Sequence, residues 1–128
     1  MNPDEKRSLI ERYLLAYNNF DLDGMLTVLH PDIEFQNISR GKTNASVVGK
    51  EAFRQLAEQG KAVFTSRRQK IREYRSDSPH EASIRVLFKG VVGMNLPNGL
   101  KKSAILEVEG RSEFQFKDGL IYRIKDIS

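Results

Sequence analysis

Two tyrosines, one asparagine and one serine are the side chains of this sequence best placed for chemistry. They are Tyr13, Tyr17, Asn37 and Ser112. Each lies at the helix or strand spacing that the nearby apolar residues follow. A phenol or a hydroxyl donates a hydrogen bond to a ligand oxygen, and an amide both donates and accepts. None of these groups is a strong base at neutral pH. The four residues therefore predict ligand binding and leave any catalytic residue unidentified.

Each of the four polar side chains also has a structural interpretation. Aromatic residues at helical spacing commonly belong to a core, where the hydroxyls of Tyr13 and Tyr17 find backbone partners. Asn37 alternates with apolar residues and needs hydrogen-bond partners, which a purely structural amide also requires. Ser112 fits plain packing between larger neighbours. The sequence leaves both interpretations open.

Several kinds of chemistry find no support in the composition. The chain of 128 residues has no Cys, which removes thiolate nucleophiles, disulfides and Cys-ligated zinc. Its histidines, His30 and His80, adjoin prolines at an expected helix end and an expected turn, where solvation and the helix dipole explain them. Without patterned carboxylate partners they make a poor metal site. We expect neither a metal nor another cofactor.

The charge balance does not indicate a nucleic-acid binder. The net charge of +4 comes from 21 basic and 17 acidic side chains, which is a small excess. The densest basic stretch, SRRQKIREYR at 66–75, places Arg68, Lys70 and Arg72 on one strand face, as solvated or edge-protecting faces do. Tyr74 alone interrupts it with a ring, so no base-stacking platform is expected. Anion binding by residues 67–75 is the weakest of the functional alternatives.

Three helices are predicted to precede residue 64. The first covers 3–18, with Asn2 as its cap and Pro3 at its first position. Asp21 caps a short second helix that closes before Pro31. A third helix ends at Gly60 and has an apolar stripe formed by Ala52, Phe53, Leu56 and Ala57. The polar stretch 40–48 before the third helix is expected to be a loop.

Period-two alternation predicts strands in the rest of the chain. One strand is centred on 33–37, and after Phe64 the strands cover 66–75, 82–92, 103–116 and 120–127. Helices first and hairpin-linked strands later predict an α+β fold. We expect a cone, in which three N-terminal helices cover a strongly curved, mainly antiparallel sheet. Gly90 and Gly110 inside strands are typical of such a bend.

The strand parities assign an inner and an outer face. The inner, apolar parity predicts a pocket lined by Tyr13, Tyr17, Phe35, Asn37, Phe53, Val86, Phe88, Val108, Ser112 and Phe114. The outer parity mixes acidic and basic residues, which is typical of a solvated face or a homodimer interface. Arg123 and Asp126 in the last strand could reach the rim of the cavity, but they are interpreted as an outer-face salt bridge.

The N-terminal residues indicate no export signal. MNPDEKRSLIERY is charged where a signal peptide is apolar, and no apolar stretch approaches the roughly 20 residues that span a bilayer. We expect one cytoplasmic domain over residues 1–128, without a membrane-spanning segment.

Two motifs resemble a known superfamily. YLLAYNNFDLDGMLTVLHPDIEF at 13–35 and FKDGLIYRIKDI at 116–127 are similar to the nuclear-transport-factor-2-like superfamily, in particular its SnoaL-like branch. The resemblance spans nearly the whole chain and implies a cystatin-like cone. The superfamily includes isomerases, dehydratases, cyclases, epoxide hydrolases and non-catalytic modules, so the resemblance implies the fold and no single reaction.

Ketosteroid isomerases are relatives that this chain resembles, and they use a Tyr, an Asp base and a protonated Asp. Aligned through RYLLAYNNFDLDGM, their Tyr corresponds to Tyr13, their base to Asn37 and their second Asp to Ser112. An amide does not accept and redeliver a proton at neutral pH. The resemblance therefore does not imply ketosteroid isomerase activity.

We expect a SnoaL-like protein that binds a small hydrophobic molecule. If it is an enzyme, the resemblance favours cofactor-free isomerisation, dehydration, cyclisation or hydrolysis, with Tyr13 as donor and water or a rim carboxylate as base. The alternative is a non-catalytic binding or association module that acts through its dimer or outer sheet face. A hollow cone favours the first interpretation, and a cone filled by its own side chains favours the second.

Overall fold

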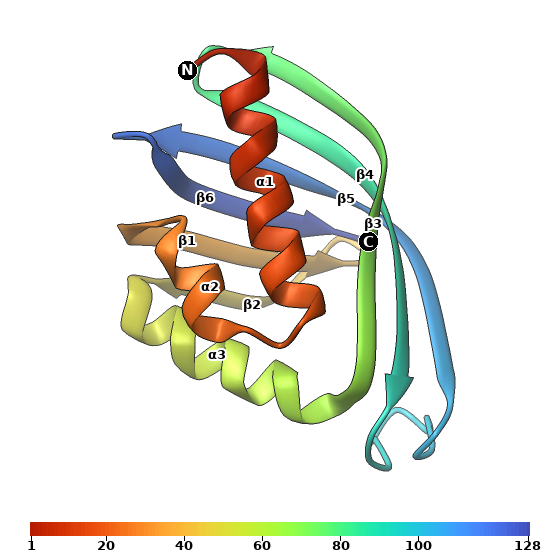
Figure 1. The fold of residues 1–128 in the computed structure, drawn as a ribbon. Helices are drawn as coiled ribbons and strands as arrows, with labels where there is room; N and C mark the ends of the chain where they lie inside the picture. Colours follow the sequence, from red (N-terminus) through yellow and green to blue (C-terminus); the bar gives the residue numbers. More distant parts are fainter.

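Three helices lie on the concave side of one strongly bent sheet (Figure 1). The computed structural model describes residues 1–128. In chain order the elements are α1 Pro3–Asn18, α2 Leu22–Thr27, β1 Leu29–Ser39, β2 Lys42–Val48, α3 Lys50–Val63, β3 Phe64–Ser78, β4 Glu81–Val92, β5 Ile105–Lys117 and β6 Leu120–Ile127. The predicted α+β fold with a curved, mainly antiparallel sheet beneath N-terminal helices is confirmed. No helix has the length and apolar character needed to cross a lipid bilayer.

The sheet consists of two antiparallel parts that meet at one parallel pair of strands. Its order is β2-β1-β6-β5-β4-β3, and only β1 and β6 run parallel. Asn37 of β1 is the register partner of Asp126 of β6 across this seam. On the other side of β6, Asp126 pairs with Ser112 of β5. Three polar residues thus lie side by side on three neighbouring strands.

A capping side chain at the N-terminus of each of the first two helices explains why α1 and α2 start where they do. The Asn2 side chain accepts a hydrogen bond from the Glu5 amide at 2.8 Å, and Pro3 begins α1. Asp21 accepts from the Gly24 amide at 2.9 Å and so caps α2. The two starts agree with the sequence prediction because capping is a local interaction.

The core lies between α1 and the inner face of the sheet. It comprises Leu9, Ile10, Tyr13 and Leu14 from α1, with Ile33, Ile84, Phe114, Phe116, Ile121 and Ile124 among its strand residues. Phe53 of α3 and Met25 of α2 close it below the helix. Along β5 the inward residues Ser112, Phe114 and Phe116 are buried, whereas Leu106 and Val108 are only half-buried where β5 extends beyond the helices.

Residues 40–48 were predicted to be a loop, and this prediction was wrong. They contain the edge strand β2, which pairs with β1 from Glu34↔Val48 to Ser39↔Lys42. Arg40 and Gly41 make the connecting turn with φ of 53° and 75°, and two positive φ values suit a tight hairpin. In β2, half-buried Ala45 and Val47 alternate with exposed neighbours, but their small side chains among polar residues give a weak strand signal.

Two predicted helix ends also differ from the structure. The third helix was expected to end at Gly60, but α3 continues to Val63 and passes directly into β3 at Phe64. A glycine inside a helix costs about 1 kcal/mol relative to alanine, which the packing of α3 outweighs. The second helix ends at Thr27, and His30 and Pro31 belong to β1.

Glycines permit the close approaches that the bent sheet requires. A Cβ at Gly90 would lie 2.8 Å from the Phe64 ring, and a Cβ at Gly110 would lie 2.9 Å from the Ile127 carbonyl oxygen. Gly110 therefore lets the end of β6 approach the backbone of β5. The sequence analysis expected a glycine here because the sheet bends.

Candidate functional site

Two adjoining cavities lie between the helices and the inner face of the sheet. One, of about 390 Å³, extends from α1 to α3 and is lined largely by apolar side chains. The other, of about 260 Å³, lies against β4 and β5. Tyr17, Asn37, Gln69 and Asp126 line both of them. The cone is therefore hollow, and its polar groups gather where the two cavities meet.

Most of the predicted pocket residues line these cavities. The larger one has Tyr13, Tyr17, Phe35, Asn37 and Phe53 on its walls. The smaller one adds Val86, Phe88, Val108 and Ser112. Phe114 lines neither cavity, because it is buried in the core with its ring edge-on to that of Tyr13 at a centroid distance of 6.4 Å.

Asp126 provides the carboxylate of the site. The Ser112 hydroxyl donates to its Oδ1 at 2.6 Å, and the side chain lines both cavities. The interpretation of Asp126 and Arg123 as an outer-face salt bridge was wrong, since none of the ion pairs includes either residue. Ile121 and Ile124 are three residues apart, yet both are buried, because the register between β5 and β6 shifts between Gln115 and Phe116. Strict alternation along β6 therefore does not predict which side chains point inward.

The environment of Asp126 favours its protonated form. Burial raises the pKa of this carboxyl from 3.8 to about 6, although the hydrogen bond from Ser112 opposes the rise. A carboxylate with a pKa near neutrality both accepts and returns a proton at physiological pH. The sequence contained one usable signal, because Asp126 lies two residues after the inward Ile124.

The two tyrosines remain phenols under ordinary conditions. Burial raises the pKa of Tyr13 well above its usual value, and the nearby charge of Asp126 raises it further. Burial also raises the pKa of Tyr17, while the charge of Arg67 partly opposes this effect. Both side chains are therefore hydrogen-bond donors on the cavity wall.

Asn37 adds an amide at the junction of the cavities. Its Nδ2 donates to Oδ1 of Asn44 on the neighbouring strand β2 at 2.8 Å. This bond fixes the amide against the edge of the sheet, so Asn37 has a structural partner as well as a place on the cavity wall. Both interpretations made from the sequence are thus compatible with its position.

Arg67 is the second charged residue at the cavity, and the sequence analysis missed it. Only 6% of its surface is exposed, whereas Arg68, Lys70 and Arg72 are exposed as predicted. Its parity along β3 is that of Gln69 and Ile71, both of them half-buried. The density of positive charge in the stretch 66–75 concealed that one of these cations points inward.

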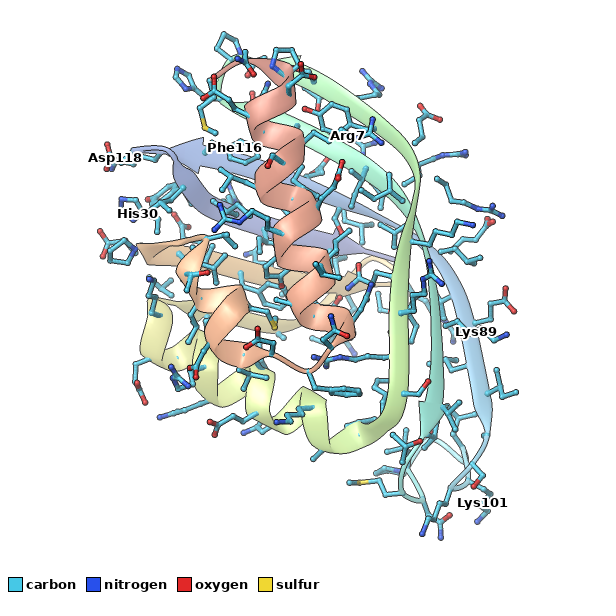
Figure 2. The ribbon with its side chains drawn as sticks, in the orientation of Figure 1. Arg7, His30, Lys89, Lys101, Phe116 and Asp118 are labelled. Carbon is cyan, nitrogen blue, oxygen red and sulfur yellow. The ribbon has the colours of Figure 1, made fainter.

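His30 does not have the solvated position that was expected. It is buried, accepts a hydrogen bond from the Asp32 amide at its Nδ1, and its Nε2 lies 3.1 Å from Asp118. Figure 2 shows His30 and Asp118 together at one end of the sheet. A hollow of about 750 Å³ beside this end includes Asp118, Tyr122 and the β3–β4 turn, but its walls are mostly polar or charged. No cluster of three potential metal ligands occurs in the structure.

Comparisons with known proteins agree with this architecture. The SnoaL-like domain family matches residues 10–124. No curated protein matches the chain significantly. Among solved structures, TsrD from Streptomyces laurentii has a TM-score of 0.80 at 19% identity, over 98% of this chain and 89% of its own.

Two further structures share the fold. A putative polyketide cyclase from Xanthomonas campestris pv. campestris has a TM-score of 0.76 at 22% identity, over 100% of this chain and 93% of its own. An uncharacterized cystatin fold protein from Novosphingobium aromaticivorans has a TM-score of 0.75 at 16% identity, over 94% and 96% of the two chains. Identities this low establish a common fold and no common substrate.

Proposed function

This chain belongs to the SnoaL-like domain family, and we propose that it binds a small apolar molecule in its adjoining cavities and that Asp126 exchanges a proton with that molecule. The observation that carries the proposal is a carboxylate with a raised pKa on the wall of a largely apolar hollow. Perturbed carboxyl groups in clefts are common among catalytic acids and bases.

The size and lining of the cavities support the ligand class. Pockets for small molecules usually measure about 300–1,000 Å³ and combine apolar walls with a few convergent polar groups. The larger cavity alone, about 390 Å³, falls in this range. The Xanthomonas structure is described as a putative polyketide cyclase, which makes ketones reasonable first probes for this chain.

The arrangement suits removal of a proton next to a carbonyl group. Ionised Asp126 takes a proton from the carbon, and the Tyr13 hydroxyl donates a hydrogen bond to the oxygen on which negative charge develops. Asp126 returns the proton at another position or to the same carbon. The base that ketosteroid isomerases have at the position of Asn37 is thereby replaced by a carboxylate on the paired strand.

The proposal predicts deuterium exchange into an apolar ketone. The protein should accelerate exchange of the protons next to the carbonyl of 2-tetralone in D₂O, as followed by proton NMR. The rate should rise as pH increases through about 6 and then level off, because the ionised form of Asp126 is the base.

Free acetate at the same concentration as the protein is the control for this experiment, since it supplies a carboxylate without a cavity. Exchange no faster than with acetate would count against proton transfer at this site. An exchange rate without an inflection near pH 6 would exclude Asp126 as the base.

The outer face of the sheet supports association as a second function. Across three strands the register aligns Arg68 and Lys89 with Glu107, and Lys70 with Glu109, so charge changes from positive on β3 to negative on β5. A second copy related by a two-fold axis would place each basic strip opposite an acidic one. We propose that this face forms a homodimer.

The dimer should depend on salt. Sedimentation velocity is expected to show a dimer at about 50 mM NaCl and dissociation toward monomer at about 500 mM, because screening shortens the range of these charges. The double substitution of Glu107 and Glu109 by Lys should give monomer at both concentrations. A monomeric wild-type protein at low salt would reject this interface.

A further inference from the structure

Arg67 is a buried cation without an anionic partner. Its side chain belongs to the lining of the larger cavity, and none of the ion pairs in the structure includes it. Its Nη2 is the one buried side-chain nitrogen or oxygen that has no hydrogen-bond partner. Buried polar atoms are nearly always paired, so this nitrogen needs an explanation.

Arg67 makes one hydrogen bond and packs against two aromatic rings. Its Nε donates to the carbonyl oxygen of Tyr17 at 2.8 Å. The guanidinium carbon lies 3.7 Å from the centre of the Tyr17 ring and 4.5 Å from that of Phe20. These contacts fix the plane of the group at the end of α1 and leave Nη2 unused.

The strand segment next to Arg67 is tied to the end of α1. The Asn18 side chain accepts from the Gln69 amide at 2.8 Å and donates to the Gln69 carbonyl at 3.2 Å. This pair of bonds ties the end of α1 to β3 beside Arg67. The guanidinium is therefore positioned before any ligand enters, which reduces the entropy lost on binding.

A guanidinium cannot relieve its burial by giving up its proton. Arginine remains charged in proteins, so an unpaired buried N–H retains the full cost of its lost hydration. Its planar fork matches the two oxygens of a carboxylate. Asp126 lines the same cavity but makes its hydrogen bond to Ser112 instead.

We propose that Arg67 binds a carboxylate of the ligand, so that this protein prefers an apolar carboxylic acid to a neutral compound of the same shape. The ligand then has its anionic end at Arg67 and its apolar body along the Phe35 and Phe53 walls, within reach of the junction where Asp126 lies. This inference rests on the proposed function for the location of the ligand, and it does not depend on proton transfer.

Two probes of nearly equal shape test the inference. 2-Naphthoate and 2-naphthamide should be titrated into the protein by isothermal calorimetry at about pH 8, where the acid is ionised. Wild-type protein should bind 2-naphthoate about tenfold or more tightly than the amide, since charge-assisted hydrogen bonds exceed neutral ones by this order. Equal affinities, or no 2-naphthoate binding at about 1 mM, would overturn the assignment.

Variants separate Arg67 from other sources of a preference. Arg67→Met should abolish the preference for 2-naphthoate, and Arg67→Lys should reduce it, because an ammonium keeps the charge without the planar fork. If Arg67→Met does not fold, Arg67→Lys and the wild-type comparison decide. A preference that Arg67→Lys and Arg67→Met both retain in full would show that another group binds the carboxylate.

Asp126→Asn distinguishes this inference from the proposed function. It should retain the preference for 2-naphthoate or increase it, because a negative charge is removed from the cavity. Failure of 2-tetralone exchange with an intact preference would reject proton transfer and leave the role of Arg67 supported. Exchange of 2-tetralone without any preference for 2-naphthoate would support proton transfer and reject the role of Arg67.

Discussion

Asp126→Asn is expected to abolish proton exchange with 2-tetralone and, at neutral pH, to stabilise the folded protein. The amide keeps an oxygen that accepts the hydrogen bond from Ser112, so the local geometry is retained. It cannot act as a base. Loss of a positioned general base usually lowers a rate by about 10²–10⁴-fold, and the remaining rate should lose its rise near pH 6.

The gain in stability follows from the raised pKa of Asp126. Between its ordinary value of 3.8 and about 6 in the folded state, the folded protein holds a proton that the unfolded chain has released. Wild-type stability therefore falls as pH rises through this interval, and the accumulated loss at neutral pH is roughly 3 kcal/mol. Asn has no such loss.

Urea unfolding of both proteins at several pH values measures this effect. The variant should be more stable than wild type above about pH 6, and the difference should disappear below about pH 4, where Asp126 is protonated in both states. Glu58→Gln, at an exposed position on α3, is the matched control and should change neither rate nor stability. A destabilised Asp126→Asn protein at pH 7 would contradict the described environment of the carboxyl group.

Lys6→Met is expected to cause a large loss of stability without affecting ligand binding. Lys6 is 1% exposed, and its ammonium donates to the Ser76 hydroxyl at 2.6 Å, to the Glu81 carbonyl at 3.0 Å and to the Ser78 carbonyl. Three donors thus meet three acceptors around the β3–β4 turn. The Lys6 side chain therefore joins the first turn of α1 to the turn between β3 and β4.

Met has a similar length and no donor, so the substitution leaves two partly buried carbonyl groups, those of Ser78 and Glu81, without their ammonium partner. Hydrogen bonds to a charged group contribute about 1.5–3 kcal/mol, and unpaired buried acceptors add a further cost, which predicts a loss of about 2–4 kcal/mol. Lys101→Met, in the exposed β4–β5 loop that Figure 2 labels, should change stability by less than about 0.5 kcal/mol.

The free energy of unfolding in urea and the affinity for 2-naphthoate are the two measurements for Lys6→Met. Unchanged stability would mean that water satisfies the turn carbonyls equally well. Weakened 2-naphthoate binding together with unchanged stability would connect Lys6 to the cavity, which its position does not support.

Features that depend on neighbouring residues were predictable from the sequence. The caps at Asn2 and Asp21 and the inward parity of Phe35 and Asn37 were recovered because each is encoded within a few residues. The family resemblance was recovered because it extends over most of the chain. The sequence left open whether the cone was hollow or filled by its own side chains, because packing of the interior depends on contacts between distant segments.

Features that depend on register or tertiary contacts were not predictable in this way. Asp126 was misassigned because the bulge next to Phe116 breaks the alternation in β6. Arg67 and Lys6 were overlooked because charged residues are rarely buried, and only the folded chain reveals the oxygens and rings that surround them. The alternation in the edge strand β2 is limited to Ala45 and Val47, and this short signal was overlooked.

The parallel seam has a kinetic consequence. Asn37 and Asp126 are register partners, yet residues 40–119 separate β1 from β6. Contacts between such distant segments require closure of a long loop, which places them among the slow events of folding. The proposed binding site is therefore expected among the last parts of the molecule to assemble. A ligand that contacts both strands would prolong the lifetime of the native state by slowing its opening.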